Sequence, residues 1–323
     1  MIRSNPFRPI YDILNSGTMQ TTSPNMPLLI DIELTNACNF NCLFCFTGTK
    51  AQKRPTGFMS RKLYEKIIDE IAPYKIPLRF IRWGEPTLHK NFFEFLKIAK
   101  EKDLMCHLTT NGSLLSEDRI MEVLKLKIDS VKFSFQGVDE KTYGEMRYGQ
   151  SFNKLLEIVK LFSSLRGDLP YPYLHAATTV TYETPEMQQS FQDQLKSYCD
   201  FVTVGHTKLS HISSEQTLLP EKAKKMLDNL KSVESIEKIY KKCNEVYDKL
   251  NINWDGTVTA CCADYDNYML VGDLTETSLR DIWENSEELK RYRSLLSAYK
   301  FAELPLCKDC YDTIDVRASI TNR

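Results

Sequence analysis

The sequence predicts an α/β fold, a partial (β/α)6 TIM-like barrel followed by a small C-terminal α+β domain. Between residues 28 and 210, short runs rich in β-branched and aromatic residues alternate six times with segments of helical periodicity. Such alternation favours a parallel sheet covered by helices, with functional groups at the C-terminal ends of the strands. After residue 243 the alternation stops, and closely spaced cysteines and a hairpin signal replace it.

Six strands are expected in the first part of the chain. In order, they are residues 28–35, 77–83, 104–112, 130–137, 173–181 and 201–209. A first helix should begin after Ser60, which can cap it, since Leu63, Ile67, Ile68 and Ile71 then share one face. Similar spacing predicts further helices over residues 91–102, 116–126, 151–166 and 185–199.

The domain boundaries follow from this pattern. At 323 residues, the chain exceeds the size at which a single core usually stops growing, so a large domain with a smaller one is expected. We predict an N-terminal extension (1–27), the barrel (28–210), a polar helical linker (211–242) and the second domain (243–323). Within the second domain, Asp255 and Gly256 in "NWDGTV" predict a hairpin turn.

Composition narrows the class of partner. The 42 Lys and Arg residues balance 43 Asp and Glu residues, so the charge gives no footprint for nucleic acid or an anionic membrane. The N-terminus lacks the apolar segment of a signal peptide, and no stretch is long enough to span a bilayer. A cytoplasmic protein is therefore expected, in which ten cysteines serve better as metal ligands than as disulfides.

Three cysteines follow the first predicted strand in "CNFNCLFC". Cys38, Cys42 and Cys45 have the spacing C-x3-C-x2-C, which lets one turn of chain present three thiolates to an iron-sulfur cluster. The fourth iron would have no protein ligand, and an open coordination position is what a catalytic metal site keeps for its substrate. A chance grouping, or a zinc site shared with "CKDC" at 307–310, is the alternative.

Together with three further motifs, this turn resembles the signature of the radical S-adenosylmethionine (radical SAM) enzymes. "WGEP" at 83–86 resembles the family's "GGEP", with Trp83 replacing the first glycine, and "TTNG" at 109–112 ends the third strand as in family members. "SFQG" at 134–137 resembles "SxDG", with Gln136 replacing the usual aspartate. The resemblance implies a 4Fe-4S cluster on the three cysteines and SAM contacts from Gly84, Glu85, Pro86, Thr110, Asn111, Ser134, Gln136 and Arg147, the last pairing with the SAM carboxylate.

A second group of cysteines lies near the C-terminus. The pattern C-x12-G-x4-C from Cys243 to Cys261 resembles the start of the SPASM and "twitch" extensions of this family. Cys307 and Cys310 would complete four ligands, which implies one auxiliary 4Fe-4S cluster because no cysteine follows Cys310. A structural zinc is the alternative for these four.

The other cysteines and the histidines receive simpler interpretations. Cys262 should point to the opposite face of its strand from Cys261, where its thiol could donate a hydrogen atom, or the two cysteines could exchange the ligand role. Cys106 and Cys199 are interpreted as buried small hydrophobic residues. The five histidines are scattered, and packing or surface roles are favoured for all of them, although His107 and His206 could reach the mouth of the barrel.

The resemblance implies that SAM is cleaved to a 5'-deoxyadenosyl radical, which the protein positions beside one C-H bond. Residues 1–27 are too few for a leader-peptide recognition domain, so a small polar substrate (a sugar, an aminocyclitol or an amine) is expected over a peptide. The leading reaction is dehydrogenation with electron transfer to the auxiliary cluster. Epimerisation with Cys262 as hydrogen donor, peptide modification and a non-enzymatic redox sensor are the alternatives. A one-electron donor such as flavodoxin or ferredoxin is the expected protein partner.

Overall fold

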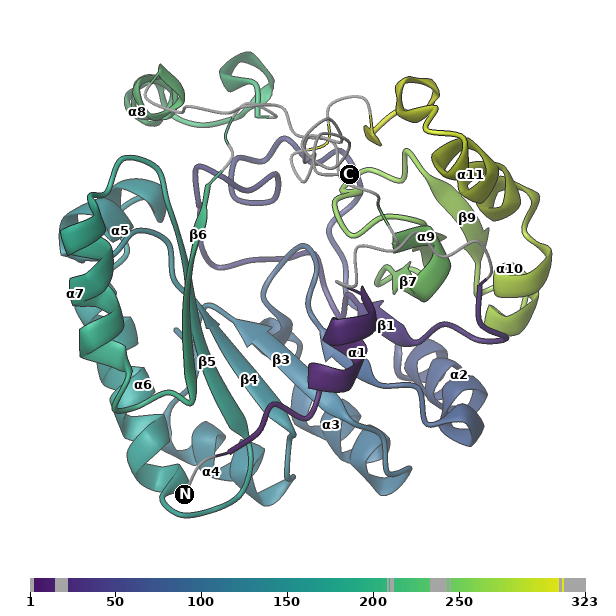
Figure 1. Cartoon of the computed structure of the whole chain (residues 1–323), viewed down its shortest axis with the longest axis horizontal. Helices are drawn as coiled ribbons and strands as arrows, with labels where there is room; N and C mark the ends of the chain where they lie inside the picture. The colour runs from purple at the N-terminus through teal and green to yellow at the C-terminus, as the bar shows by residue number, and fades with distance from the viewer. Residues whose placement is uncertain are drawn as a thin grey trace, which may run out of the picture.

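A computed structural model describes residues 3–14, 23–207, 209, 212–232, 243, 245–307 and 310 of the chain. In these residues nine strands form one sheet, in the order β6-β5-β4-β3-β2-β1-β7-β8-β9 (Figure 1). The strands are β1 (Leu29–Ile32), β2 (Leu78–Phe80), β3 (Cys106–Thr110), β4 (Ser130–Ser134), β5 (Tyr173–Val180), β6 (Phe201–His206), β7 (Lys249–Ile252), β8 (Thr257–Thr259) and β9 (Leu270–Asp273).

The first six strands are all parallel and confirm the six predicted from the sequence. Strand β7 continues the sheet, because it pairs in parallel with β1, Asp31 lying opposite Asn251. Strand β8 is antiparallel to both β7 and β9, and the predicted hairpin joins β7 to β8, with Gly256 at a φ of 97°. The C-terminal segment is therefore built onto the edge of the barrel sheet.

Helices cover the outer face of the barrel sheet, as the alternation predicts (Figure 1). Helix α2 is capped as expected, since the Leu63 backbone N–H donates to the Ser60 hydroxyl at 3.2 Å. The short α5 was not predicted. The barrel helices are α2 (Arg61–Ile71), α3 (Phe92–Glu101), α4 (Glu117–Lys125), α5 (Glu140–Met146), α6 (Phe152–Arg166) and α7 (Pro185–Leu195); α8 (Glu221–Ser232) lies in the predicted linker, and α9 (Glu245–Asp248), α10 (Leu279–Asn285) and α11 (Glu287–Ser297) accompany β7–β9.

The N-terminal segment packs against the inner face of the sheet. Helix α1 (Arg8–Leu14) follows Phe7, which is fully buried with its ring edge-on to His107 of β3, at 5.6 Å between centroids. Tyr11 of α1 lies against the guanidinium of Arg79, 5.8 Å from its ring centroid. In Figure 1, α1 lies in front of the barrel strands. Residues 3–14 thus cover part of the concave side.

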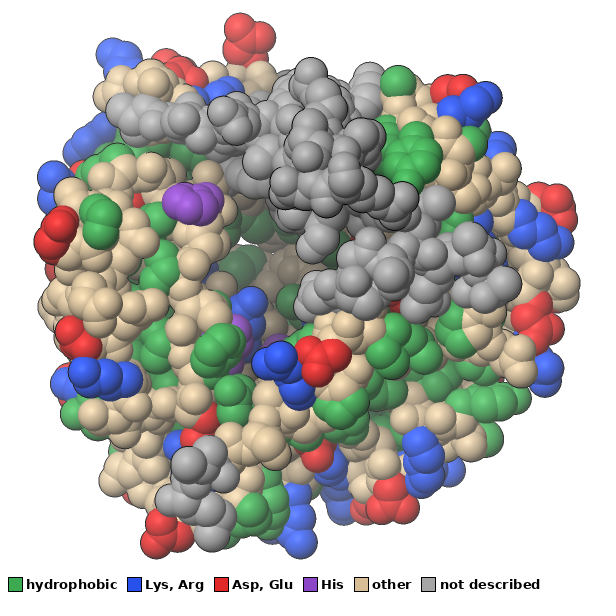
Figure 2. All heavy atoms as spheres, in the orientation of Figure 1, with side chains coloured by type: hydrophobic (Ala, Val, Ile, Leu, Met, Phe, Trp, Pro, Cys, Tyr) green, Lys and Arg blue, Asp and Glu red, His purple; other side chains and the backbone are tan. Residues whose placement is uncertain are grey.

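The two faces of the barrel sheet differ in polarity. Ile30 and Ile32 belong to the large apolar core, whereas Asp31 between them points to the concave side. The neighbouring strands repeat this pattern, and Figure 2 shows a hollow on this side of the molecule with Lys or Arg and His side chains on its wall. The charged and imidazole residues of this inner face are Asp31, Arg79, His107, Lys132, His175 and Lys249.

No helix in the described parts of the chain has the length and apolar character needed to cross a bilayer.

Candidate active site

The three-cysteine turn closes on itself directly after β1. The Cys45 backbone N–H donates to the Cys42 carbonyl at 3.3 Å, and the Thr49 N–H donates to the Cys45 carbonyl at 2.8 Å. Gly48 lies against this turn so closely that a Cβ there would stand 2.4 Å from the Cys42 nitrogen. The turn is therefore fixed by short backbone contacts around its three thiols.

The thiols of this turn are largely withdrawn from water. Cys42 is buried, and Cys38 and Cys45 are half-buried. Burial and the nearby charge of Cys42 raise the pKa of Cys38 to about 12, and the same two causes raise the pKa of Cys45. The neutral thiol form is therefore favoured at Cys38 and Cys45 near neutral pH.

In the described residues, no three His, Cys, Asp or Glu side chains converge on one point as a single metal ion requires. An iron-sulfur cluster makes a different demand, because each cysteine binds a separate iron. Three neighbouring thiols on one tight turn fit that demand.

The "WGEP" segment is pressed against the start of the cysteine turn. Gly84 has a φ of 106°, and a Cβ on it would stand 2.4 Å from the Thr35 carbonyl oxygen and 2.7 Å from that of Ala37. The next residue, Glu85, donates its backbone N–H to the Ala37 carbonyl at 2.8 Å. Glycine is required at position 84 for both its backbone angle and its close approach.

We expect Gly84→Ala to lower the free energy of unfolding by about 1–3 kcal/mol or more, because it adds a clash to an unfavourable backbone angle. Gly149→Ala is the matched control, since Gly149 has a φ of 84° but a Cβ there meets nothing within 4 Å. Urea titration of both variants measures the difference. Equal losses would mean that the backbone angle alone, and not the contact with the cysteine turn, requires glycine at position 84.

The Glu85 carboxylate is fully engaged inside the protein. One oxygen accepts hydrogen bonds from the Thr110 hydroxyl at 2.8 Å and from Thr87, and the other accepts from the Asn111 backbone N–H at 2.8 Å. The Asn111 amide in turn donates to Asn39 of the cysteine turn at 3.0 Å. Glu85, Thr110 and Asn111 thus join the ends of β2 and β3 to the turn, and Pro86 is buried beside them.

Arg147 lies over the cysteine turn from the end of α5. Its guanidinium donates to the Cys42 sulfur at 3.4 Å and to the Ser134 carbonyl, and it packs against the rings of Phe40 and Phe44. Arg147 is buried, and its Nε has no acceptor in the described part of the chain. The Nε–H of this buried cation lies beside the three thiols and is therefore available to donate a hydrogen bond to a further anionic group.

Ser134, the last residue of β4, and Gln136, two residues after it, behave differently. Ser134 is half-buried on the concave side, whereas Gln136 is buried and donates its side-chain amide to the Thr207 hydroxyl. Thr207 continues the chain of hydrogen bonds to Thr179 of β5 at 2.8 Å. Gln136 therefore tethers the segment after β6 to the end of β4.

The second group of cysteines is also brought together. Burial raises the pKa of Cys243 well above its usual range, and the charges of Cys307 and Cys310 add to the shift. The Cys310 backbone N–H donates to the Cys307 carbonyl at 3.4 Å, and the negative charge of Cys243 also acts on Cys261. All four side chains are half-buried.

The orientation expected for Cys262 assumed that it lies within a strand. Interaction with the neighbouring Cys261 thiol and burial raise the pKa of Cys262 well above its usual range. Strand β8 ends at Thr259, so the alternation of side chains along a strand no longer applies two residues later. Cys106 and Cys199, by contrast, are buried as predicted.

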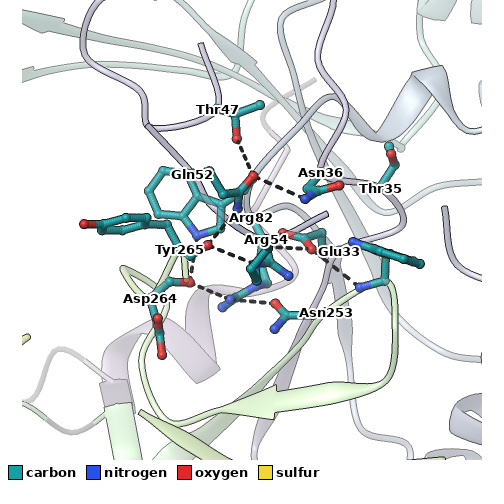
Figure 3. A network of polar contacts seen from close by, with 12 residues as sticks. Glu33, Thr35, Asn36, Thr47, Gln52, Arg54, Arg82, Asn253, Asp264 and Tyr265 are labelled. Atoms are coloured by element: carbon teal, nitrogen blue, oxygen red, sulfur yellow. Dashed lines mark hydrogen bonds and ion pairs between the residues drawn. The ribbon is translucent and has the colours of Figure 1, made fainter. Parts of the chain in front are cut away.

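Arg82 joins the end of β2 to the loop that contains Cys261, a role that the sequence did not indicate. It lies just before "WGEP" and donates to the Asn253 side chain at 2.9 Å, to the Asp264 carbonyl at 2.9 Å and to the Cys261 carbonyl at 3.4 Å (Figure 3). Trp83 also donates to the Asp264 carbonyl, at 2.9 Å. The C-terminal loop is thus held beside the mouth of the barrel.

A buried ion pair supports the same junction. Glu33 accepts two hydrogen bonds from Arg54, at 2.8 and 2.9 Å, and both side chains are almost completely buried. Gln52 donates to the Tyr265 carbonyl at 2.8 Å, and the Tyr265 ring stacks on Phe46 of the cysteine turn. Figure 3 shows these residues converging from the barrel and from the C-terminal segment.

Comparison with known protein families identifies both parts. Residues 32–186 match the radical SAM superfamily, and residues 243–311 match the SPASM iron-sulfur cluster-binding domain. The chain belongs to the radical SAM superfamily. Membership implies a 4Fe-4S cluster and SAM for the barrel, and the SPASM match implies further iron-sulfur binding in the C-terminal segment.

Relatives of this radical SAM protein have several functions. The chain is 24% identical over 321 residues to the tungsten-containing aldehyde ferredoxin oxidoreductase cofactor-modifying protein of Pyrococcus furiosus. This match covers 86% of each of the two chains. It is 26% identical over 297 residues to the PqqA peptide cyclase of Bradyrhizobium diazoefficiens, covering 83% of this chain and 76% of that one. One of these relatives is thus a cofactor-modifying protein and the other a peptide cyclase, so the two differ in what they act on.

Solved structures share the fold of this radical SAM protein. BtrN in complex with AdoMet and 2-DOIA gives a TM-score of 0.56 at 19% identity, covering 89% of this chain and 94% of that chain. SuiB of Streptococcus suis bound to S-adenosylmethionine gives a TM-score of 0.65 at 17% identity, covering 84% of this chain and 68% of that chain. At these identities the likeness establishes the α/β architecture alone.

Proposed function

We propose that this radical SAM enzyme removes hydrogen from a small polar substrate held on the concave side of the barrel, in a dehydrogenation. The observation that carries the proposal is the polar inner wall, where Lys132 of β4 and His175 of β5 lie side by side in the register of the sheet. An apolar substrate would leave these groups desolvated without partners, at a cost in free energy.

The two groups of cysteines fit the iron-sulfur clusters that the family implies. We assign the 4Fe-4S cluster to Cys38, Cys42 and Cys45, and the auxiliary cluster to the second cysteine group, Cys243, Cys261, Cys307 and Cys310. When bound, SAM and the first cluster would supply the 5'-deoxyadenosyl radical that takes one hydrogen atom from the substrate. The substrate would then lose one proton to water and one electron to the auxiliary cluster, which together with the hydrogen atom make up the two hydrogens lost. A one-electron donor such as flavodoxin or ferredoxin would complete the cycle.

The protein's own contribution is to bind and orient. Arg147 has an unused buried donor next to the cysteine turn, which suits the carboxylate of SAM. The backbone of Gly84 and Glu85 is fixed by the cysteine turn, while the Glu85 carboxylate holds Thr110 and Asn111 in place and so positions the SAM site. Ser134 faces the concave side above the substrate space. Arg82 keeps the second cysteine group close to that space, as electron transfer requires.

The test is a search for substrate with the anaerobically reconstituted, reduced enzyme and SAM. We expect a polar metabolite to increase 5'-deoxyadenosine formation and to yield a product two hydrogens lighter by mass spectrometry. A product of unchanged mass in ordinary water that takes up one deuterium when the reaction runs in D2O would instead establish epimerisation. Cys262→Ala would then show whether its thiol supplies that hydrogen. A modified peptide as product would refute the small-molecule proposal, and retained iron without SAM binding would favour a redox sensor.

A further inference from the structure

The inner wall of the barrel contains one cation whose charge nothing nearby balances. Asp31 accepts two hydrogen bonds from Arg79, at 2.6 and 2.7 Å, and one from Lys249 at 3.2 Å. Lys249 also pairs with Glu245 at 2.7 Å, so these two cations and two carboxylates cancel. Lys132 of β4 forms no hydrogen bond or ion pair within the described residues, and the network therefore leaves a net charge of one positive unit on this wall.

The two register partners of Lys132 are polar and uncharged, and the only charge of the described residues that measurably acts on its ammonium is the positive one of Arg79 on β2. Lys132 lies opposite Thr109 of β3 and opposite His175 of β5 in the register of the sheet. Burial and the charge of Lys132 lower the pKa of His175 to about 3, so this imidazole is uncharged near neutral pH. Its Nε2 is 2.7 Å from the Thr203 hydroxyl of β6, which fixes the ring. Hydroxyl and imidazole groups therefore surround the ammonium with further hydrogen-bonding capacity.

The position of Lys132 is that of a substrate contact. It precedes Ser134 by two residues on the same strand, so the two side chains share the concave face, with Lys132 one layer deeper. The side chain is only half-buried. Figure 2 shows the hollow on this side, with basic and imidazole side chains on its wall. A small molecule occupying this hollow would meet the ammonium below the cysteine turn.

We propose that Lys132 binds a carboxylate group of the substrate, with His175 and Thr203 beside it. This inference rests on the proposed function and narrows its substrate class from polar molecules to polar carboxylic acids. Burial lowers the pKa of Lys132, and an anionic partner would offset the cost of holding its charge there. One uncompensated positive unit matches the single charge of a carboxylate, whereas a phosphate monoester carries about 1.5 to 2 negative charges.

The first experiment measures the accessibility of the amine in the reconstituted enzyme with SAM bound. Limited acetylation with acetic anhydride, followed by peptide mass spectrometry, gives the rate of labelling at Lys132. Glycolate and ethylene glycol are a matched pair of probes that differ in the carboxylate, and inorganic phosphate is the third. We expect glycolate to slow labelling at Lys132 several-fold and ethylene glycol to leave it unchanged. Labelling of Lys125, exposed on α4, should not respond to any probe.

Each other result counts against the proposal. Equal protection by ethylene glycol would mean that the probes protect Lys132 by occupying the hollow and not by binding its charge. Protection by phosphate alone would replace the carboxylate with a phosphate as the ligand. If Lys132 is never labelled, or if glycolate does not protect it, Lys132 is not a carboxylate-binding site.

A second experiment separates this site from the proposed reaction. Lys132→Gln should weaken glycolate binding about tenfold or more, because it removes a charge-assisted hydrogen bond, whereas Lys132→Arg should retain most of it. Lys125→Gln is the control, and all three variants should keep wild-type iron content and SAM affinity. If carboxylate binding depends on Lys132 but no acid loses two hydrogens, the dehydrogenase proposal fails and the binding site stands. If a neutral metabolite is dehydrogenated equally well by Lys132→Gln, the site fails and the proposed function stands.

Discussion

A chain with Cys38→Ala, Cys42→Ala and Cys45→Ala is expected to hold about four irons after anaerobic reconstitution, where the unmodified chain holds about eight, because each 4Fe-4S cluster needs its own cysteine ligands. The measurement is iron and acid-labile sulfide per chain. The variant should also form no 5'-deoxyadenosine. The physical reason is local: these thiols lie on one short turn, and no other cysteine within the described residues is bonded into it.

Cys106→Ala/Cys199→Ala is the matched control for this experiment. Both thiols are buried in the apolar core, away from either cysteine group, so their removal should leave about eight irons. An unmodified chain with only about four irons, all lost in the triple variant, would mean that the second group binds zinc or nothing. The auxiliary cluster would then have to be abandoned together with dehydrogenation by electron transfer to it.

The local features of this fold could be predicted from sequence because each depends on residues close together in the chain. Alternating apolar runs located β1 to β6, Ser60 located the start of α2, and Asp255–Gly256 located the β7–β8 turn. Helix α5 was missed because it has only seven residues, one of them Gly144, which is unfavourable within a helix.

Long-range features could not be predicted in this way. The pairing of β1 with β7 joins Asp31 to Asn251, and no spacing rule connects residues so far apart. Arg82 gave no signal for the same reason, since its role depends on contacts with the loop that contains Cys261 and Asp264. The motif residues could be named from the sequence, but the structure was needed to show that the Glu85 carboxylate holds Thr110 and Asn111 in place.

The inner wall shows how a strand pattern can conceal a site. Lys132 and His175 lie in runs that were interpreted only as strands, and histidines were assigned to packing or surface roles. Their chemical interest arises from register, which places them side by side, and from Asp31 and Glu245, which together neutralise the other two cations of this wall. All of these residues can be identified in the sequence, but their pairing across the sheet cannot be predicted from it.

Asp31→Ala is expected to lower the free energy of unfolding by about 3–5 kcal/mol, because it leaves Arg79 and Lys249 as buried cations without their shared partner. Asp31 is only 1% exposed, so water cannot replace the carboxylate. Asp12→Ala is the matched control, since the Asp12–Arg8 pair lies on the surface and should contribute about 0–1 kcal/mol. Urea titration of the two variants gives both values.

The pH dependence of stability tests the same pair of contacts. Burial alone would raise the pKa of Asp31, but Arg79 and Lys249 hold it well below its usual range. A carboxyl whose folded-state pKa is depressed stabilises the fold above its unfolded pKa of about 3.9, and that contribution is lost as the pH falls further. The difference in stability between wild type and Asp31→Asn should therefore be constant from neutral pH to about pH 5 and shrink below about pH 4. A difference in stability that stays constant in acid would show that Asp31 acts by its shape and hydrogen bonds and not by its charge. The charge balance of the described inner wall, in which Lys132 is the one uncompensated cation, would then no longer hold.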